Sequence, residues 1–346
     1  MDKRNSYLDV AKFLFSIIVI LFHCGYFFHG GYIVVEAFFM ISGYFMMCSL
    51  ARDKGELSLG VATAKFVAHK YKSIAFYLIP SALIGCAVYA YIIPGRDLLT
   101  TLIESSLIVF EVIPLQVSGF QGYYTTGVSW YLSALFLTML MIYPLARKFR
   151  ENFTLTFSPL ISILTYGYLA SRCGHLEVPN NIVDLFNTGL LRGIAGICAG
   201  CFLYECSTRL GNREISISGK VLFTILEIAG WAFCVFCIHK YPKSEHDFTT
   251  VIIMFGLLII GINRYSLLSY LIQFRWTKYL ANISMVIYLN HYYWHIFLNA
   301  WRPNITLNEK LPIYFALITV SSAFVYFVGR FSMRLWDKRM SKKVSA

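Results

Sequence analysis

The feature that most constrains the fold of this chain is the recurrence of long apolar stretches from its beginning to its end. Most of them approach the roughly 20 residues that a helix needs to cross a bilayer. Inside hydrocarbon the backbone cannot bond to water, so a crossing segment must satisfy its own backbone groups. Only 14% of the residues are charged, against roughly 25% in soluble domains. The sequence therefore predicts an all-α, polytopic membrane protein.

Length and apolar character together predict ten spans. They are Leu8–Phe28, Ile33–Leu50, Ile74–Ile93, Gly127–Ala146, Leu155–Ser171, Thr188–Cys206, Val221–Ile238, Thr249–Asn263, Tyr279–Leu298 and Leu311–Gly329. The loops between them are too short for a separate soluble domain, so we expect one transmembrane domain over residues 1–346. Lys3 and Arg4 precede the first stretch and no small-residue cleavage site follows it. We expect a retained span, not a signal peptide.

The basic residues between the spans predict the orientation. With a cytoplasmic N-terminus, 22 of the 30 Lys and Arg residues lie inside, six lie outside, and Lys12 and Arg192 fall within spans. The positive-inside rule then places both termini in the cytoplasm of a cell that carries the protein in its plasma or inner membrane. The net charge of +12 thus reflects topology, and we expect no nucleic-acid partner.

Residues 97–115 are apolar but carry Glu104 and Glu111. An eleventh span here would invert everything that follows and place 15 basic residues outside. We therefore expect an external helix or loop that lies on the membrane.

Two pairs of cysteines have C-x-x-C spacing, Cys198 with Cys201 and Cys234 with Cys237. Both pairs lie within apolar helices. There a thiol behaves as a small packing residue, so we expect neither disulfides nor metal from them.

Three ionisable residues mark the first two spans. His23 lies in the outer part of the first span and Lys12 in its inner part, eleven residues and roughly 16 Å apart along a helix. Glu36 enters the outer half of the second span. A carboxylate can hold an imidazole in the tautomer that a general base needs. The alternatives are a packed histidine bonded to a carbonyl and a buried ion pair.

A further pattern lies in the order of short motifs along the chain. The first motifs are Leu8–Lys12, Phe22-His23 and Val35–Tyr44, and the later ones are Val128–Leu132, Leu191–Gly200 and Ile283–His291. Together they resemble the acyltransferase 3 family, integral membrane enzymes that acylate surface sugars, peptidoglycan and exported small molecules. The resemblance covers nearly the whole chain.

The resemblance implies roles for five residues. His23 would be the catalytic base, and Glu36 would orient it. Lys12 would stabilise the acyl donor, and Lys70 and Lys72 would meet donor phosphates on the cytoplasmic side. The implied donor is acyl-CoA, expected to be acetyl-CoA, used as a substrate without a bound cofactor. The implied acceptor is a hydroxyl of a cell-surface or lipid-linked glycan, and membrane lipids are the other expected partners.

Five further residues are assigned supporting roles, namely Ser42, Trp130, Arg192, Tyr288 and His291. Arg192 lies a turn inside its span, so snorkelling to the surface is an alternative. Trp130 also suits an interfacial aromatic belt. His291 and His295 are one turn apart, but no suitable third ligand accompanies them, so we expect no metal.

Ser42 and Gly43 have two interpretations. They could form a nucleophile and its turn, but a pair of small residues within a helix more often permits close helix packing, as with Gly196 and Gly200.

The chain also departs from the family pattern. Lys12 stands where the family usually has arginine, which keeps the charge but loses the planar fork. The stretch from His69 to Phe76 lacks the second arginine and the proline of the family motif. These departures indicate a divergent subfamily and weaken the prediction of the donor site.

We therefore predict a membrane O-acyltransferase in which His23 deprotonates an acceptor hydroxyl. One alternative is a proton-coupled small-molecule or sugar transporter that relays protons through His23, Glu36 and Lys12. It predicts symmetry between the two halves, and none is visible. The other alternative is a non-catalytic assembly or sensor protein that has kept the fold.

Overall fold

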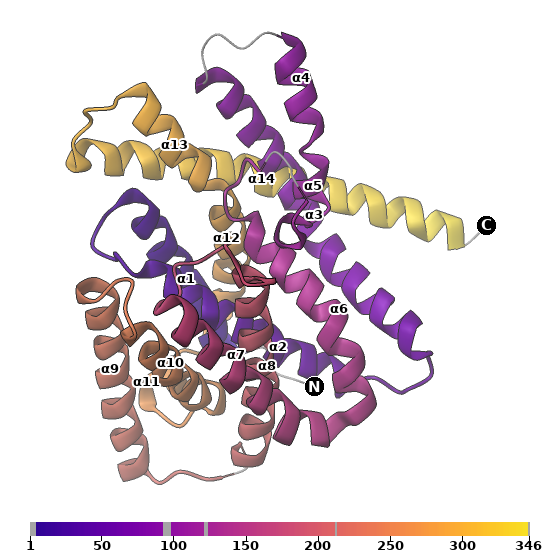
Figure 1. Ribbon diagram of the computed structural model, residues 1–346. Coiled ribbons are helices and arrows are strands. Elements are labelled where there is room, and N and C mark those ends of the chain that lie inside the picture. The colour runs from indigo at the N-terminus through magenta and orange to yellow at the C-terminus, as the bar shows by residue number, and fades with distance from the viewer. Residues whose placement is uncertain (1–4, 93–97, 121–123, 212, 345–346) are drawn as a thin grey trace.

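The computed structural model describes residues 5–92, 98–120, 124–211 and 213–344, and nearly all of their regular structure is helical. The main helices pack into a bundle, and α14 extends beyond it toward the C-terminus (Figure 1). They are α1 (Ser6–Cys24), α2 (Val34–Leu50), α3 (Leu59–Ile92), α6 (Ser129–Asn152), α7 (Ser158–Cys173), α8 (Thr188–Leu210), α9 (Ile217–Lys240), α10 (His246–Asn263), α12 (Thr277–Asn290) and α14 (Leu307–Val344).

Short elements connect these helices. They are η1 (Gly31–Ile33), α4 (Leu98–Ser106), α5 (Val109–Val112), η2 (Gln116–Ser118), η3 (Phe153–Phe157), α11 (Leu267–Leu271) and α13 (Tyr292–Trp301). Strands β1 (Ile182–Val183) and β2 (Phe186–Asn187) form an antiparallel hairpin in which Ile182 pairs with Asn187. The predicted starting charges Lys3 and Arg4 and the predicted span end at Ile93 lie outside the described residues.

Eight helical segments of the described chain are long and apolar enough to cross a membrane. One of them, Ser129–Cys173, covers nearly all of the fourth predicted span and all of the fifth. It is 45 residues long, and Arg150 interrupts it with a non-helical backbone (φ 47°, ψ −119°). The protein is thus a multi-pass helical membrane protein, while the predicted count of ten is not confirmed.

The ninth predicted span, Tyr279–Leu298, is wrong as a single helix. It breaks at His291 into α12, of 14 residues, and α13, of 10 residues. Side chains satisfy backbone groups near the break, because Ser81 Oγ donates to the Leu289 carbonyl at 2.9 Å and His291 Nδ1 lies 2.7 Å from the Tyr288 carbonyl. Irregular backbone at membrane depth is tolerated where protein surrounds it.

The segment before the third predicted span also differs from expectation. The third predicted span begins at Ile74, but α3 starts at Leu59 and runs unbroken for 34 residues. The ambiguous stretch after α3, predicted to lie on the membrane, contains only α4 and α5 of nine and four residues among its described part. Both helices are too short to span the bilayer.

Helices α2 and α8 approach each other closely at two glycines. A Cβ on Gly43 would lie 2.3 Å from the Ile197 carbonyl oxygen, and one on Gly200 would lie 2.1 Å from the Met40 carbonyl oxygen. The interpretation of these small residues as a close packing interface is confirmed. Cys198 and Cys201 of α8 are fully buried, as expected of packing residues.

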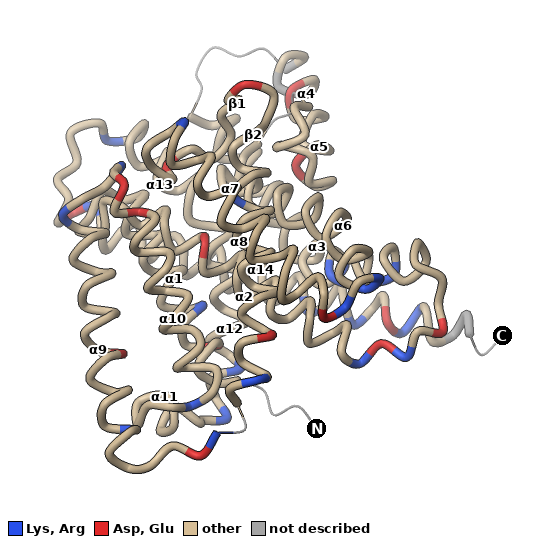
Figure 2. Tube along the Cα trace, turned by 60° about the horizontal axis from the view of Figure 1, so that its bottom comes forward, with Lys and Arg blue, Asp and Glu red and all other residues tan. Residues whose placement is uncertain are grey.

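Charged side chains are unevenly distributed over the bundle. In Figure 2, Lys and Arg residues gather along the C-terminal part of α14 and around the loops near the N-terminus, while the middle of most helices carries few charges. Such a pattern is typical of helices whose central parts lie in hydrocarbon. The cytoplasmic assignment of the termini stays a prediction.

Candidate active site

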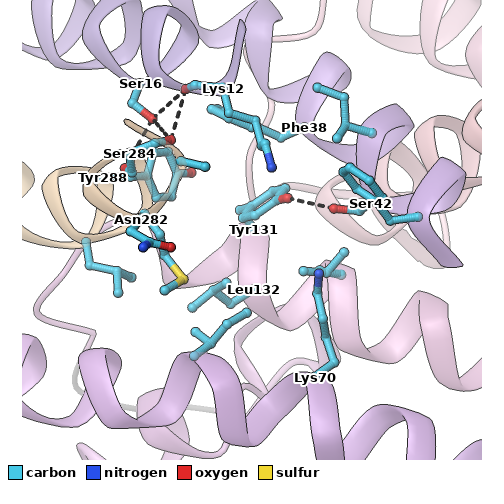
Figure 3. Close-up of a pocket in the computed structure, with 17 residues that line it drawn as sticks. Lys12, Ser16, Phe38, Ser42, Lys70, Tyr131, Leu132, Asn282, Ser284 and Tyr288 are labelled. Carbon is cyan, nitrogen blue, oxygen red and sulfur yellow. Dashed lines mark hydrogen bonds between the residues drawn. The ribbon is translucent and has the colours of Figure 1, made fainter. Parts of the chain in front are cut away.

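A cavity of about 200 Å³ lies between α1, α2, α3, α6 and α12. Lys12 reaches it from α1, and Lys70 reaches it from α3 on the opposite side (Figure 3). None of the described residues that line the cavity is acidic. The structure therefore brings together two cations that are 58 positions apart in the sequence.

Lys12 has further contacts at the cavity wall. Its ammonium lies 3.7 Å from the Asp9 carboxylate and 5.1 Å from the centre of the Phe45 ring. One turn further along α1, Ser16 Oγ lies 2.8 Å from Ser284 Oγ, which fixes α1 against α12. Lys12 is thus held at the cavity edge by both an acid and an aromatic face.

Lys72 does not line this cavity, so the structure does not bring it together with Lys70 there. Its ammonium lies 2.8 Å from Asp337 and 5.6 Å from the centre of the Trp336 ring on α14. The reason is that residues 70–72 are helical, and a helix turns by roughly 200° over two residues. Lys70 and Lys72 therefore face opposite sides of α3.

His23 lies in the last turn of α1, which Gly25 ends in a left-handed conformation. Its half-buried ring lies 5.1 Å from the ring of His291 and 5.0 Å, edge to face, from the ring of Tyr292. His291 is fully buried at the break between α12 and α13. The break therefore places a second histidine beside the first.

The tautomer of His291 follows from its partners. A carbonyl oxygen can only accept, so Nδ1 must donate to the Tyr288 carbonyl. In the neutral ring Nε2 is then an acceptor, and it has no hydrogen-bond partner among the described residues. An unsatisfied acceptor thus lies in the ring that neighbours His23.

Glu36 belongs to a different cluster. Its carboxylate accepts from Arg192 Nε at 2.6 Å and from the Tyr166 hydroxyl at 2.6 Å. Arg192 is fully buried, and its guanidinium lies 4.7 Å from the centre of the Trp130 ring. The structure therefore joins Glu36 to Arg192 instead of His23, and the snorkelling alternative for Arg192 is wrong.

One side of the cavity carries hydroxyl groups and aromatic rings, contributed by Ser42, Tyr131 and Tyr288. Ser42 Oγ lies 3.5 Å from the Tyr131 hydroxyl, and the rings of Tyr131 and Tyr288 lie 5.8 Å apart. Tyr288 also lies 5.7 Å from the His291 ring. Tyr288 therefore connects the wall of the cationic cavity to the two histidines.

Sequence reasoning missed the role of Glu111 within the segment that was predicted to be external. Its buried carboxylate accepts four hydrogen bonds, from the backbone amide and the hydroxyl of both Thr125 and Thr126. The next residue, Gly127 (φ +64°), packs so tightly against Tyr292 that a Cβ would lie 1.9 Å from the ring. A glutamate in a mainly apolar stretch was the available signal.

The fold and the site thus define a multi-pass membrane protein with a histidine pair and a separate cationic cavity along the same helix. A family model described as an acyltransferase domain matches residues 5–330, nearly the whole chain. The chain belongs to the acyltransferase 3 family, as its motifs predicted, and is an acyltransferase. No curated protein and no solved structure gives a significant match.

Proposed function

We propose that the protein transfers an acyl group, expected to be acetyl, from cytoplasmic acyl-CoA to a hydroxyl of a cell-surface or lipid-linked glycan. The observation that carries this proposal is the arrangement of α1. Lys12 and Lys70 converge on one cavity whose described lining residues include no acid, and His23 lies at the far end of α1 beside His291. The two lysines could bind an anionic donor, and His23 could accept the proton of a hydroxyl acceptor.

In the proposed reaction, an imidazole nitrogen of His23 takes the proton of the acceptor hydroxyl. The hydroxyl oxygen attacks the thioester carbonyl carbon, the carbon–sulfur bond breaks, and the proton passes to the departing CoA sulfur. The products are the O-acyl ester and free CoA. Direct attack requires no acyl-enzyme.

His291 would support this base. With Nδ1 committed to a carbonyl, its Nε2 can accept a hydrogen bond from a ring N–H of His23. That bond would leave the other nitrogen of His23 free to act as the base. In this proposal His291 replaces Glu36 as the orienting group, while Glu36 and Arg192 hold α2 and α8 in register.

Lys12 and Lys70 would bind the anionic part of the donor. Charges in a pocket of low dielectric attract anions more strongly than they would in water. The cavity is too small for the whole of CoA, so the thin pantetheine arm would have to pass Tyr288 toward the histidines. Membership of an acyltransferase family weighs against the transporter alternative.

The test is acyl transfer measured by mass spectrometry of surface glycans in cells with the wild-type protein or His23→Ala. His29, an exposed histidine just beyond α1, provides the matched control His29→Ala. We expect the acyl mass increment to disappear only in the His23 variant at equal membrane expression. An increment that persists without His23 would exclude it as the base.

The donor site needs a separate measurement. Lys12→Met and Lys70→Met keep side-chain length but remove the charge, and each should raise the KM for acyl-CoA. Lys72→Met, on the other face of α3, is the control and should leave it unchanged. If all three variants kept the wild-type KM for acyl-CoA, the cavity would not be part of the donor site.

A further inference from the structure

A buried cation near the histidine pair has no acidic partner among the described residues. Lys310 lies in the first turns of α14 and is only 7% exposed. Its ammonium lies 2.7 Å from Asn299 Oδ1 and 3.3 Å from His295 Nδ1, both neutral groups of α13. Burial of a charge without a counter-charge is costly, so such a residue suggests a ligand that supplies one.

Polar groups continue along the same face of α14. Lys310, Tyr314, Ile318 and Ser322 are spaced by four residues and therefore lie one above the other, and we name them the α14 stripe. The Tyr314 hydroxyl and Ser322 Oγ are buried and have no partner among the described residues. Three polar groups of the stripe thus have unmet bonding or charge requirements.

The C-terminal part of the α14 stripe, Ile318 and Ser322, borders an apolar groove of about 430 Å³ between α1, α12 and α14. Its walls include Phe13, Ile17 and Ile20 of α1, Ile287 of α12, and Phe315 and Phe327 of α14. Phe327 is 71% exposed, so the groove opens at the surface of the bundle. At membrane depth the available material to fill such a groove is hydrocarbon.

The lengths fit one amphiphilic molecule. Lys310 and Phe327 are separated by 17 residues, roughly 25 Å along α14, which approaches the roughly 30 Å thickness of a hydrocarbon core. Ile20, which lines the groove, is three residues and about one turn from His23. Lys310 also connects to His23 through rings, because His295 lies 6.3 Å from Tyr292 and Tyr292 lies 5.0 Å from His23.

We propose that Lys310 and the groove along α14 bind the acceptor as a lipid with an anionic head, with its phosphate at Lys310 and its hydrocarbon tail in the groove. This inference rests on the proposed function, since it places the sugar of a lipid-linked phosphate beside His23. It assigns the donor and the acceptor to cavities on the two sides of the α1–α12 contact.

The test uses purified full-length protein in an uncharged detergent, with farnesyl phosphate as the probe. Farnesol supplies the tail alone, and inorganic phosphate supplies the anion alone. Binding is read as the concentration-dependent rise in melting temperature, since a ligand that prefers the folded state stabilises it. We expect farnesyl phosphate to bind at least tenfold more tightly than either part.

Two variants locate the two ends of the probe. Lys310→Met removes the charge and keeps the length, and replacement of a buried charge by an apolar group of similar volume often preserves stability. It should weaken farnesyl phosphate binding by roughly tenfold to a hundredfold, the effect of losing a hydrogen-bonded charge, and should not change farnesol binding. Thr319→Trp, at an exposed position in the groove wall, should weaken both.

The control is Lys240→Met, which removes an exposed lysine from the last turn of α9. Unchanged farnesyl phosphate binding by Lys310→Met would overturn the proposal. Equal displacement of the probe by phosphatidylglycerol would also overturn it, because the groove would then be a general lipid site. His23→Ala should bind the probe like the wild type, so failure of the catalytic proposal and failure of this one can be distinguished.

Discussion

The buried ion pair between Glu36 and Arg192 gives the sharpest stability prediction. Both side chains are at most 1% exposed, and the 2.6 Å bond between them joins α2 to α8. Arg192→Met leaves the Glu36 carboxylate buried without its cation. Breaking a buried pair from one side costs about 3 to 5 kcal/mol, and we expect that loss in the free energy of unfolding of the full-length protein.

A double-mutant cycle separates the pair from its surroundings. Glu36→Gln alone leaves a buried guanidinium and should also destabilise the protein, while the double variant removes both charges. We expect the double variant to be more stable than the sum of the single losses predicts, by up to about 3 kcal/mol. Thermal or denaturant unfolding in detergent, followed by tryptophan fluorescence, measures all three variants.

The matched control is the exposed pair of Arg172 and Asp184, whose side chains are 49% and 47% exposed. Because water screens such pairs, Arg172→Met should cost far less stability than Arg192→Met. If Arg192→Met cost no more than Arg172→Met, or if the double variant showed simple additivity, the assignment of Glu36 and Arg192 as a coupled structural pair would be refuted.

Three further predictions concern other parts of the fold. Gly43→Ala places a Cβ 2.3 Å from a backbone oxygen of α8, so it should destabilise the protein by about 1 to 3 kcal/mol in the same unfolding assay. Gly127→Ala drives a Cβ into Tyr292, whose ring packs on the candidate base, so acyl transfer should fall by about a hundredfold. Adding Tyr292→Ala should recover part of that loss, and no recovery would argue against the steric explanation. The hydrogen bond from Arg147 holds the pKa of the Asp53 carboxyl below its usual range, so its stabilisation is complete above the unfolded-state pKa and is lost as pH falls through the folded-state pKa. The wild type should therefore lose more stability on acidification to pH 3 than Arg147→Met, and parallel losses would contradict this.

Much of the fold could be predicted from local sequence. The apolar stretches located α1, α2, α8, α9 and α10 to within a few residues, because a bilayer leaves a crossing backbone little choice but a helix. The two main errors have identifiable causes in the structure. The ninth span breaks at His291, where side-chain bonds replace helical ones, and α3 continues through a charged region that hydropathy assigns to a loop.

The candidate site was predicted in its parts but not in its pairings. His23 and Lys12 were identified because charges in apolar helices are rare and costly, and Lys70 was identified because the family resemblance implied a role for it. Their sequence positions could not show that Glu36 would meet Arg192, 156 residues away, or that His291 would meet His23. Those contacts depend on which helices become neighbours.

The sequence by itself thus determined that the chain spans a membrane as helices, which family it belongs to, and which ionisable residues its spans contain. Hydropathy, length and motif order are local properties, and the bilayer converts them directly into secondary structure. Only the tertiary structure decided the face of α3 that carries Lys70 into the cavity, the partner of Glu36, and the groove below Lys310. The physical reason is that packing between helices is selected by side-chain shape and polar satisfaction across distant segments, and no local pattern encodes it.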